Sequence, residues 1–192
     1  MSLDAIWKVT TSELYLLTLT HDVEIHSFVL MPNHFHLLLT VPKDDLGRIM
    51  NLYMAAVTKT VNQLSGRSGR LFGGPYYWSI ITCTRYYGHA FKYIYRNPVR
   101  AGICIRVEEY PFSTIQGLVG IAPAPLPLTY TRNGMEINLP EHENTPNWLD
   151  WLNTPFPREA EKLLRKVMSR REIKPIIERV KRKPIDQLAH FL

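Results

Sequence analysis

The sequence predicts an α+β protein in which helices pack on an antiparallel sheet. Two short β-prone runs, 24–31 and 35–41, flank a Pro32-Asn33 turn, which is typical of an antiparallel hairpin. Residues 45–64 carry apolar side chains three and four positions apart, the spacing of an amphipathic helix. No apolar run approaches the roughly 20 residues that a transmembrane helix needs, so we expect no membrane span.

The remaining elements follow from local patterns. Residues 5–21 are expected to form a helix, and 76–82, rich in aromatic and β-branched residues, a strand. A helix over 86–96 is expected to end at Asn97-Pro98, because proline disfavours helical geometry in the residue before it. The sequence also predicts a basic loop at 65–70, a linker at 122–127, a small hairpin at 128–137 around Asn133-Gly134, and a helix at 158–171.

Composition and charge narrow the class of protein. The chain has 192 residues, which suits one domain with an appendage: a main domain over 1–121 and an extension over 122–192. Two cysteines are too few for a disulfide framework, and the N-terminus lacks a secretion signal, so we expect a cytoplasmic protein. The net charge of +6 lies entirely in residues 158–192, which hold 11 basic and 5 acidic residues. This basic tail suits contacts with phosphates, although a solvated helix has the same composition.

His34 and His36 are candidate metal ligands at the start of a predicted strand. Side chains alternate across a strand, so both imidazoles project from the same face, whereas Phe35 points to the other. Two adjacent imidazoles can bind one divalent ion and leave other positions open, as a catalytic metal requires. The alternative is a pair of partly exposed strand histidines with no ligand.

Tyr93 and Asn97 form a second candidate pair. Four positions apart on a helix, they share a face and could supply a nucleophile and an oxygen ligand. Because a phenol is a weak nucleophile near pH 7, it needs a metal beside it. Alternatively, Tyr93 is a packing residue and Asn97 a helix cap. Tyr86, Tyr87 and Tyr95 compete as nucleophiles on composition alone.

These two segments resemble one family. The stretch from Phe28 to Leu39, which contains Met31-Pro32-Asn33-His34-Phe35-His36, and the later Tyr93-Ile94 with Asn97-Pro98-Val99-Arg100-Ala101-Gly102 look like the hallmark segments of the REP-associated tyrosine transposases. The resemblance covers residues 24–120 well and the tail more loosely. It implies a ferredoxin-like, RRM-like antiparallel sheet with the histidines on a central strand, a main domain of the HUH type, and a basic helical tail.

The resemblance also implies the chemistry. His34, His36 and Asn97 would hold Mg²⁺ or Mn²⁺, and Tyr93 would attack single-stranded DNA at hairpins to give a 5′-phosphotyrosine link. The expected backbone contacts are basic residues of the 65–70 loop, the second motif and the tail: Arg67, Arg70, Arg100, Lys162, Arg165, Lys166, Arg170 and Arg171. Tyr76, Tyr77 and Trp78 are expected either to stack on unpaired bases or to pack in the core or an interface.

The sequence departs from the family pattern in two places. Family members usually begin with a central strand carrying a Tyr-His-Val-like segment, and no counterpart precedes Ala5. Where the family has an Arg and a Lys before a Ser, this chain has Tyr77 and Trp78 before Ser79. Two expected phosphate-binding charges are therefore missing from that segment.

Two other functions fit parts of the sequence. A domesticated relative would bind structured nucleic acid without cutting it, and would keep its affinity when Tyr93 becomes Phe. A metallohydrolase that activates water at the histidine pair would release product with no protein attached, but this leaves the second motif unexplained.

For the oligomeric state we favour a monomer over a homodimer, because the long tail could cover a pairing surface.

Overall fold

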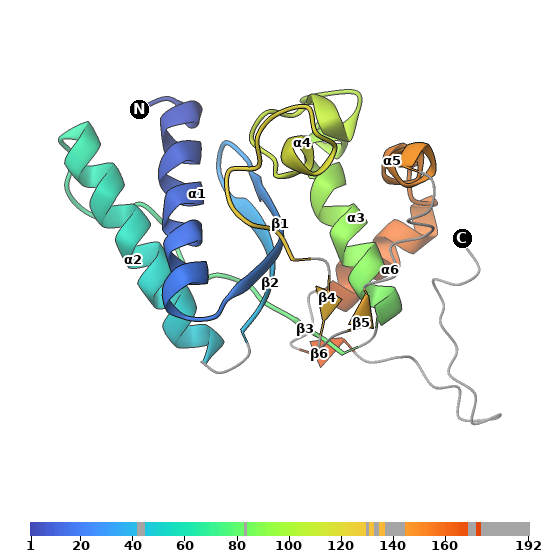
Figure 1. Cartoon of the computed structure of the whole chain (residues 1–192), viewed down its shortest axis with the longest axis horizontal. Coiled ribbons are helices and arrows are strands. Elements are labelled where there is room, and N and C mark those ends of the chain that lie inside the picture. Colours follow the sequence, from blue (N-terminus) through green and yellow to red (C-terminus); the bar gives the residue numbers. More distant parts are fainter. Residues whose placement is uncertain are drawn as a thin grey trace. The chain divides into compact units, whose positions relative to one another are not determined.

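The computed structural model describes residues 1–41, 45–82, 84–129, 131–132, 135–136, 145–168 and 172–173. Its contacts divide the chain into two compact units, of which the first contains 1–75 with 93–136 and the second 76–92 with 137–192. Helix α3 contributes residues to both units (Figure 1). No helix within the described ranges is long and apolar enough to cross a membrane.

The elements of the first unit begin with a helix and a hairpin. In chain order they are α1 (Leu3–Thr20), β1 (Glu24–Leu30), β2 (Phe35–Thr40), α2 (Leu46–Ser65), the end of α3 (Thr84–Arg100), the 3₁₀ turn η1 (Val107–Glu109), α4 (Ile115–Leu118), β4 (Thr131–Arg132) and β5 (Met135–Glu136). The second unit contains β3 (Ile80–Ile81), the start of α3, α5 (Thr145–Asn153), α6 (Arg158–Met168) and β6 (Glu172–Ile173).

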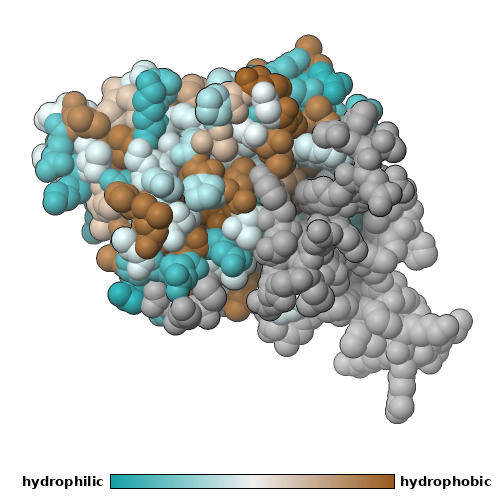
Figure 2. All heavy atoms as spheres, viewed as in Figure 1, coloured by the Kyte–Doolittle hydropathy of each residue, from teal (hydrophilic) through white to brown (hydrophobic). Residues whose placement is uncertain are grey.

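Helices α1 and α2 lie side by side against one face of the β1–β2 hairpin (Figure 1). Ser2 caps α1, and Asp45 caps α2 by accepting a hydrogen bond from the Gly47 amide at 2.9 Å. The Trp7 ring of α1 stacks on Phe28 of β1, with ring centroids 5.4 Å apart. The outer side of these helices is mixed: Figure 2 shows hydrophilic and apolar side chains interspersed over them.

The predicted antiparallel hairpin forms, and its register places the histidine strand beside the core of β1. Strands β1 and β2 are antiparallel, with Val29 opposite His36 and Leu30 opposite Phe35. Phe35 points towards the helices, where its ring contacts Tyr53 of α2 at 5.8 Å. Because side chains alternate along a strand, His36 points to the opposite face. The helices thus bury the apolar face and leave the histidine face for other residues.

The second edge of β1 is covered by later parts of the chain. The Leu30 amide donates to the Phe112 carbonyl, and the Thr114 amide donates to the Phe28 carbonyl, at 2.9 and 3.0 Å. Near the start of β1 the Thr129 amide donates to Ile25 at 2.8 Å. β1 therefore lies between β2 and these two short segments, which fix its position beside the histidine strand.

In the second unit, the start of α3 packs on residues of α5 and of the segment between α5 and α6. The buried Lys92 ammonium lies 4.7 Å from the Trp151 ring centroid and 4.9 Å from that of Phe156. Such cation–π contacts offset part of the cost of burying the charge.

The α+β class, with an antiparallel two-stranded sheet and helices packed on it, is confirmed. The predicted helices at 5–21 and 45–64, the β1–β2 hairpin and the small 128–137 hairpin also form, although Asn133-Gly134 lies outside the described residues. Of the helix predicted at 158–171, residues 158–168 are helical and 169–171 lie outside the described residues. Much of the basic tail beyond is likewise not described, and the boundary at 121/122 stays a prediction.

Two predicted boundaries are wrong. The strand predicted at 76–82 is reduced to Ile80–Ile81, and Tyr77 is 99% exposed, so the β-propensity of residues 76–79 does not make them part of the strand. Helix α3 does not end at Asn97-Pro98 but continues to Arg100. The proline is tolerated there because the missing N–H falls in the last turn, where a side chain replaces its hydrogen bond.

Candidate active site

His34 and His36 lie next to each other at the start of β2, as predicted. Their Nε2 atoms are 3.1 Å apart, and the two rings meet edge to face with centroids 4.9 Å apart. The other nitrogen of His34, Nδ1, lies 2.7 Å from Asn33 Oδ1. A hydrogen bond to Nδ1 orients the ring and leaves Nε2 directed at its neighbour, so the turn residue Asn33 helps to form the pair.

The surroundings of both imidazoles favour the neutral form. Burial lowers the pKa of His36 to about 4, with further contributions from the nearby charges of His34 and Arg100, while a hydrogen bond to Asn97 acts in the opposite direction. Burial and then the charge of Arg100 lower the pKa of His34 as well. Neutral imidazoles present the lone pairs that a metal ion needs.

The end of α3 faces the histidine pair through one stripe of side chains. Tyr93, Asn97 and Arg100 are four and then three positions apart, so they lie on one helix face. The Tyr93 ring meets the His36 ring edge to face, with centroids 6.0 Å apart. The Arg100 Nη1 donates to the Tyr93 hydroxyl oxygen at 3.0 Å. Four of the predicted residues thereby come together with Arg100 at one place.

Pro98 explains how Asn97 is oriented. Proline lacks an N–H, so the Ile94 carbonyl loses its usual intrahelical donor. The buried Asn97 amide nitrogen donates to the carbonyls of Tyr93 and Ile94, at 2.8 and 3.5 Å. With its nitrogen engaged by the helix, the amide presents its oxygen to His36, with which it forms a hydrogen bond.

Gly102 ends α3 and thereby fixes the position of Arg100. It has a left-handed φ of +70°, and its amide donates to the Val99 carbonyl while that of Ile103 donates to Pro98, both at 3.0 Å. These two hydrogen bonds form a Schellman motif, in which glycine is favoured because a side chain strains the left-handed backbone. The segment 97–102 is thus a helix stop that retains Arg100 in the last turn.

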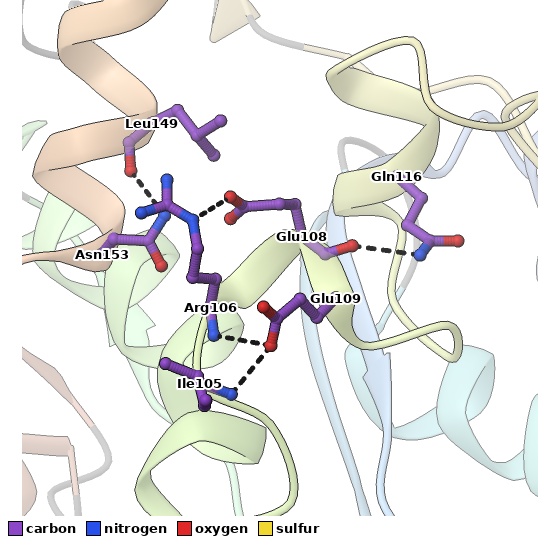
Figure 3. A network of polar contacts seen from close by, with 7 residues as sticks. All are labelled: Ile105, Arg106, Glu108, Glu109, Gln116, Leu149 and Asn153. Carbon is purple, nitrogen blue, oxygen red and sulfur yellow. Dashed lines mark hydrogen bonds and ion pairs between the residues drawn. The ribbon is translucent and has the colours of Figure 1, made fainter.

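A polar network follows α3 in the chain, and the residue after it bonds to β1. The Glu109 carboxylate accepts from the amides of Ile105 and Arg106 at 2.9 and 3.0 Å, and the Arg106 side chain pairs with Glu108 (Figure 3). Just beyond it, Tyr110 donates its hydroxyl to the Leu30 carbonyl at 2.7 Å. The hydrogen bonds of Glu109 and Tyr110 therefore help to fix α3, which carries Tyr93, relative to β1 and β2.

The competing tyrosines are poorly placed for attack. Tyr86, Tyr87 and Tyr95 are buried, and the Tyr95 hydroxyl is 2.9 Å from Thr114 Oγ1. Tyr93 is only half-buried, and its ring contacts that of His36. Of these four tyrosines, the geometry therefore favours Tyr93 as the candidate for the attacking residue.

The donor set fits a small divalent cation. Neighbouring ligands of an octahedral ion with bonds near 2.1 Å lie about 3 Å apart, similar to the 3.1 Å between the two Nε2 atoms. Within the described ranges no three His, Cys, Asp or Glu side chains gather in a metal-binding cluster. The polar side chain that contacts the pair from α3 is instead the amide of Asn97, which hydrogen-bonds His36.

The predicted DNA-contacting residues that the structure describes belong to several elements of the two units. Arg67 lies after α2, which ends at the left-handed Gly66, and Arg70 is exposed a few residues later. Lys162 and Lys166 are exposed on α6. The Arg165 backbone is helical but its side chain is not described, and Arg170 and Arg171 lie outside the described residues. Arg100 contacts the candidate site through the Tyr93 hydroxyl.

Comparison with known proteins agrees with the resemblance noted in the sequence. A REP-associated tyrosine transposase of Escherichia coli (strain K12) is 31% identical over 93 residues, a match that spans 47% of this chain and about half, 53%, of that protein. The resemblance to these transposases is thus confirmed. No profile of a known protein family matches the chain.

A solved structure supports the fold. The chain is similar to a REP-associated tyrosine transposase bound to a REP hairpin, with a TM-score of 0.54 and 24% sequence identity. The likeness covers 70% of this chain and 81% of the other. At this identity the likeness establishes the shared α+β fold.

Proposed function

We propose that this chain is a REP-associated tyrosine transposase, which nicks and rejoins single-stranded DNA next to hairpins with the help of Mg²⁺ or Mn²⁺. The relative in Escherichia coli and the fold support this class of protein. The observation that carries the proposal is the placement of the Tyr93 ring beside the His34–His36 pair, with Asn97 on the same helix face. A nucleophile and a candidate metal site in contact are what such chemistry requires.

In the proposed reaction the Tyr93 hydroxyl oxygen attacks the phosphorus of a phosphodiester. A bond forms between this oxygen and phosphorus, and the bond from phosphorus to the 3′-oxygen breaks. The phenol loses one proton, and the released 3′-oxygen gains one to become a hydroxyl group. The bound cation would supply charge stabilisation at the phosphate. His34, His36 and Asn97 would hold it, and the 5′-phosphotyrosine link conserves the bond for later joining.

The test uses the full chain and its Tyr93→Phe variant with end-labelled DNA hairpins that carry single-stranded flanks. With Mn²⁺ we expect a covalent protein–DNA band on denaturing gels, which EDTA or the Phe substitution abolishes. Equal hairpin affinity of both proteins with no band from either would instead identify a non-cleaving binder. Cleavage without an attached protein would point to hydrolysis by water.

A further inference from the structure

The Arg100 side chain contacts the proposed nucleophile in two ways. Its Nη1 donates to the Tyr93 hydroxyl oxygen at 3.0 Å, and its guanidinium carbon lies 5.5 Å from the centre of the same ring. A phenol ring held at its oxygen and across its face has fewer rotamers than one held at a single point. The contact therefore restricts where the Tyr93 oxygen can lie.

The backbone places Arg100 there for a reason specific to this helix. Residues seven apart lie two turns apart on the same face, so the arginine reaches back over Asn97 to Tyr93. Without the last turn of α3, which continues through Pro98, the arginine would not lie on this face. A cation in the last helical turn is also favoured by the helix dipole.

The ring that Arg100 contacts lies against the histidine pair. The Tyr93 and His36 rings meet edge to face, with centroids 6.0 Å apart. The hydrogen bond from Arg100 therefore acts on a hydroxyl group whose ring already contacts a candidate metal ligand.

We propose that Arg100 is a positioning residue, which fixes the Tyr93 hydroxyl beside the His34–His36 pair for attack on the phosphodiester. This inference rests on the proposed function and replaces a general backbone-contact role for Arg100 with a specific one. A poorly positioned nucleophile lowers the rate of the chemical step, and small displacements cost on the order of 10²-fold. Affinity for the hairpin depends on many other contacts and is little affected.

The experiment measures covalent adduct formation in single turnovers at several DNA concentrations, which separates the rate at saturation from the affinity. For Arg100→Ala we expect a rate at saturating DNA reduced about 10²-fold, with hairpin affinity within about threefold of the unaltered protein. Arg100→Lys, which keeps the charge and one donor, should recover part of that rate. Circular dichroism checks that both variants fold.

The matched control is Lys59→Ala, which also removes one positive charge but lies exposed on α2, behind the opposite face of the hairpin. Its rate and affinity should be unchanged. If Arg100→Ala keeps its rate at saturation, or loses only affinity, the positioning role is wrong and a backbone contact remains. If the unaltered protein forms no adduct at all, the proposed function fails together with this inference.

Discussion

Asn97 hydrogen-bonds His36 across the gap between α3 and β2, while its amide nitrogen donates back to the Tyr93 carbonyl at 2.8 Å. One side chain thus joins the helix of Tyr93 to the histidine strand. We propose that Asn97 has two separable roles, one in completing the last turns of α3 and one in presenting an oxygen to a metal ion.

Substitutions of Asn97 should separate these roles. Both Asn97→Ala and Asn97→Asp lose the donors to the helix carbonyls, so we expect a free energy of unfolding lower by about 1 to 3 kcal/mol. Only Asn97→Asp keeps an oxygen ligand, and it alone should retain Mn²⁺ binding in calorimetric titrations. Equal Mn²⁺ affinity of the Ala variant and the unaltered protein would exclude Asn97 as a ligand.

The lowered pKa of His36 predicts a pH-dependent stability in the absence of metal. Above about pH 6.5 this imidazole is neutral in both folded and unfolded chains, so it contributes no pH dependence. As the pH falls from 6.5 towards about 4, the unfolded chain gains a proton that the folded protein does not bind at this residue. The free energy of unfolding should therefore fall in this window.

Urea unfolding with EDTA, at half-unit steps between pH 4 and 7.5, measures this effect. His36→Gln should show a shallower dependence on pH than the unaltered protein. Identical slopes for the two proteins would mean that the folded environment does not disfavour the charged imidazole.

Glycine substitutions within and just after α3 should act in opposite directions. Gly102→Ala forces a side chain into a left-handed conformation, so we expect a loss of about 1 kcal/mol in the free energy of unfolding and slower adduct formation. Gly88→Ala, where a Cβ meets nothing within 4 Å, should instead gain about 0.5 to 1 kcal/mol. Thermal unfolding of the two variants provides the comparison, and a stabilising Gly102→Ala would contradict the helix-stop assignment.

Tyr77 should contribute to binding of unpaired bases. Its side chain is 99% exposed, so Tyr77→Ala should leave the melting temperature unchanged. If a base stacks on this ring, affinity for a hairpin with a single-stranded flank should fall about tenfold, with no change for a blunt hairpin. Tyr15→Ala, which removes a partly exposed ring from α1, is the control. Equal losses on both DNAs would argue against stacking on the flank.

Arg67 and Arg70 should contact phosphates rather than bases. Each substitution by Ala should reduce the slope of log affinity against log salt concentration by about 0.7 to 0.9, whatever the DNA sequence. Fluorescence anisotropy titrations at salt concentrations from about 50 to about 300 mM measure this slope. A change in sequence preference instead would indicate base contacts.

Much of the candidate site was predictable because it depends on short-range periodicity. The two-residue repeat of a strand puts His34 and His36 on one face, and the helical repeat puts Tyr93 and Asn97 on another. That these two faces meet follows from tertiary packing, which spacing alone does not reveal. The resemblance to the transposases was the observation that predicted one site formed by both pairs.

The contact of Arg100 with Tyr93 could not be predicted in the same way. The Asn97-Pro98 pair indicated the end of the helix, whereas the structure continues it to Arg100 because the Asn97 side chain compensates for the proline. β-Propensity also predicted a longer strand around Tyr77, whereas the strand within that segment is Ile80–Ile81 and Tyr77 is 99% exposed. In both places the local preference did not decide where the element ends.

The most direct test of the central claim is mass spectrometry of the covalent adduct. After reaction with a hairpin DNA and Mn²⁺, nuclease and protease digestion leaves a nucleotide on the attacking side chain. We predict that the modified peptide carries the phosphate on Tyr93, and that no modified peptide forms in EDTA. A phosphate on Tyr86, Tyr87 or Tyr95, or DNA cleavage with no modified peptide, would contradict the account.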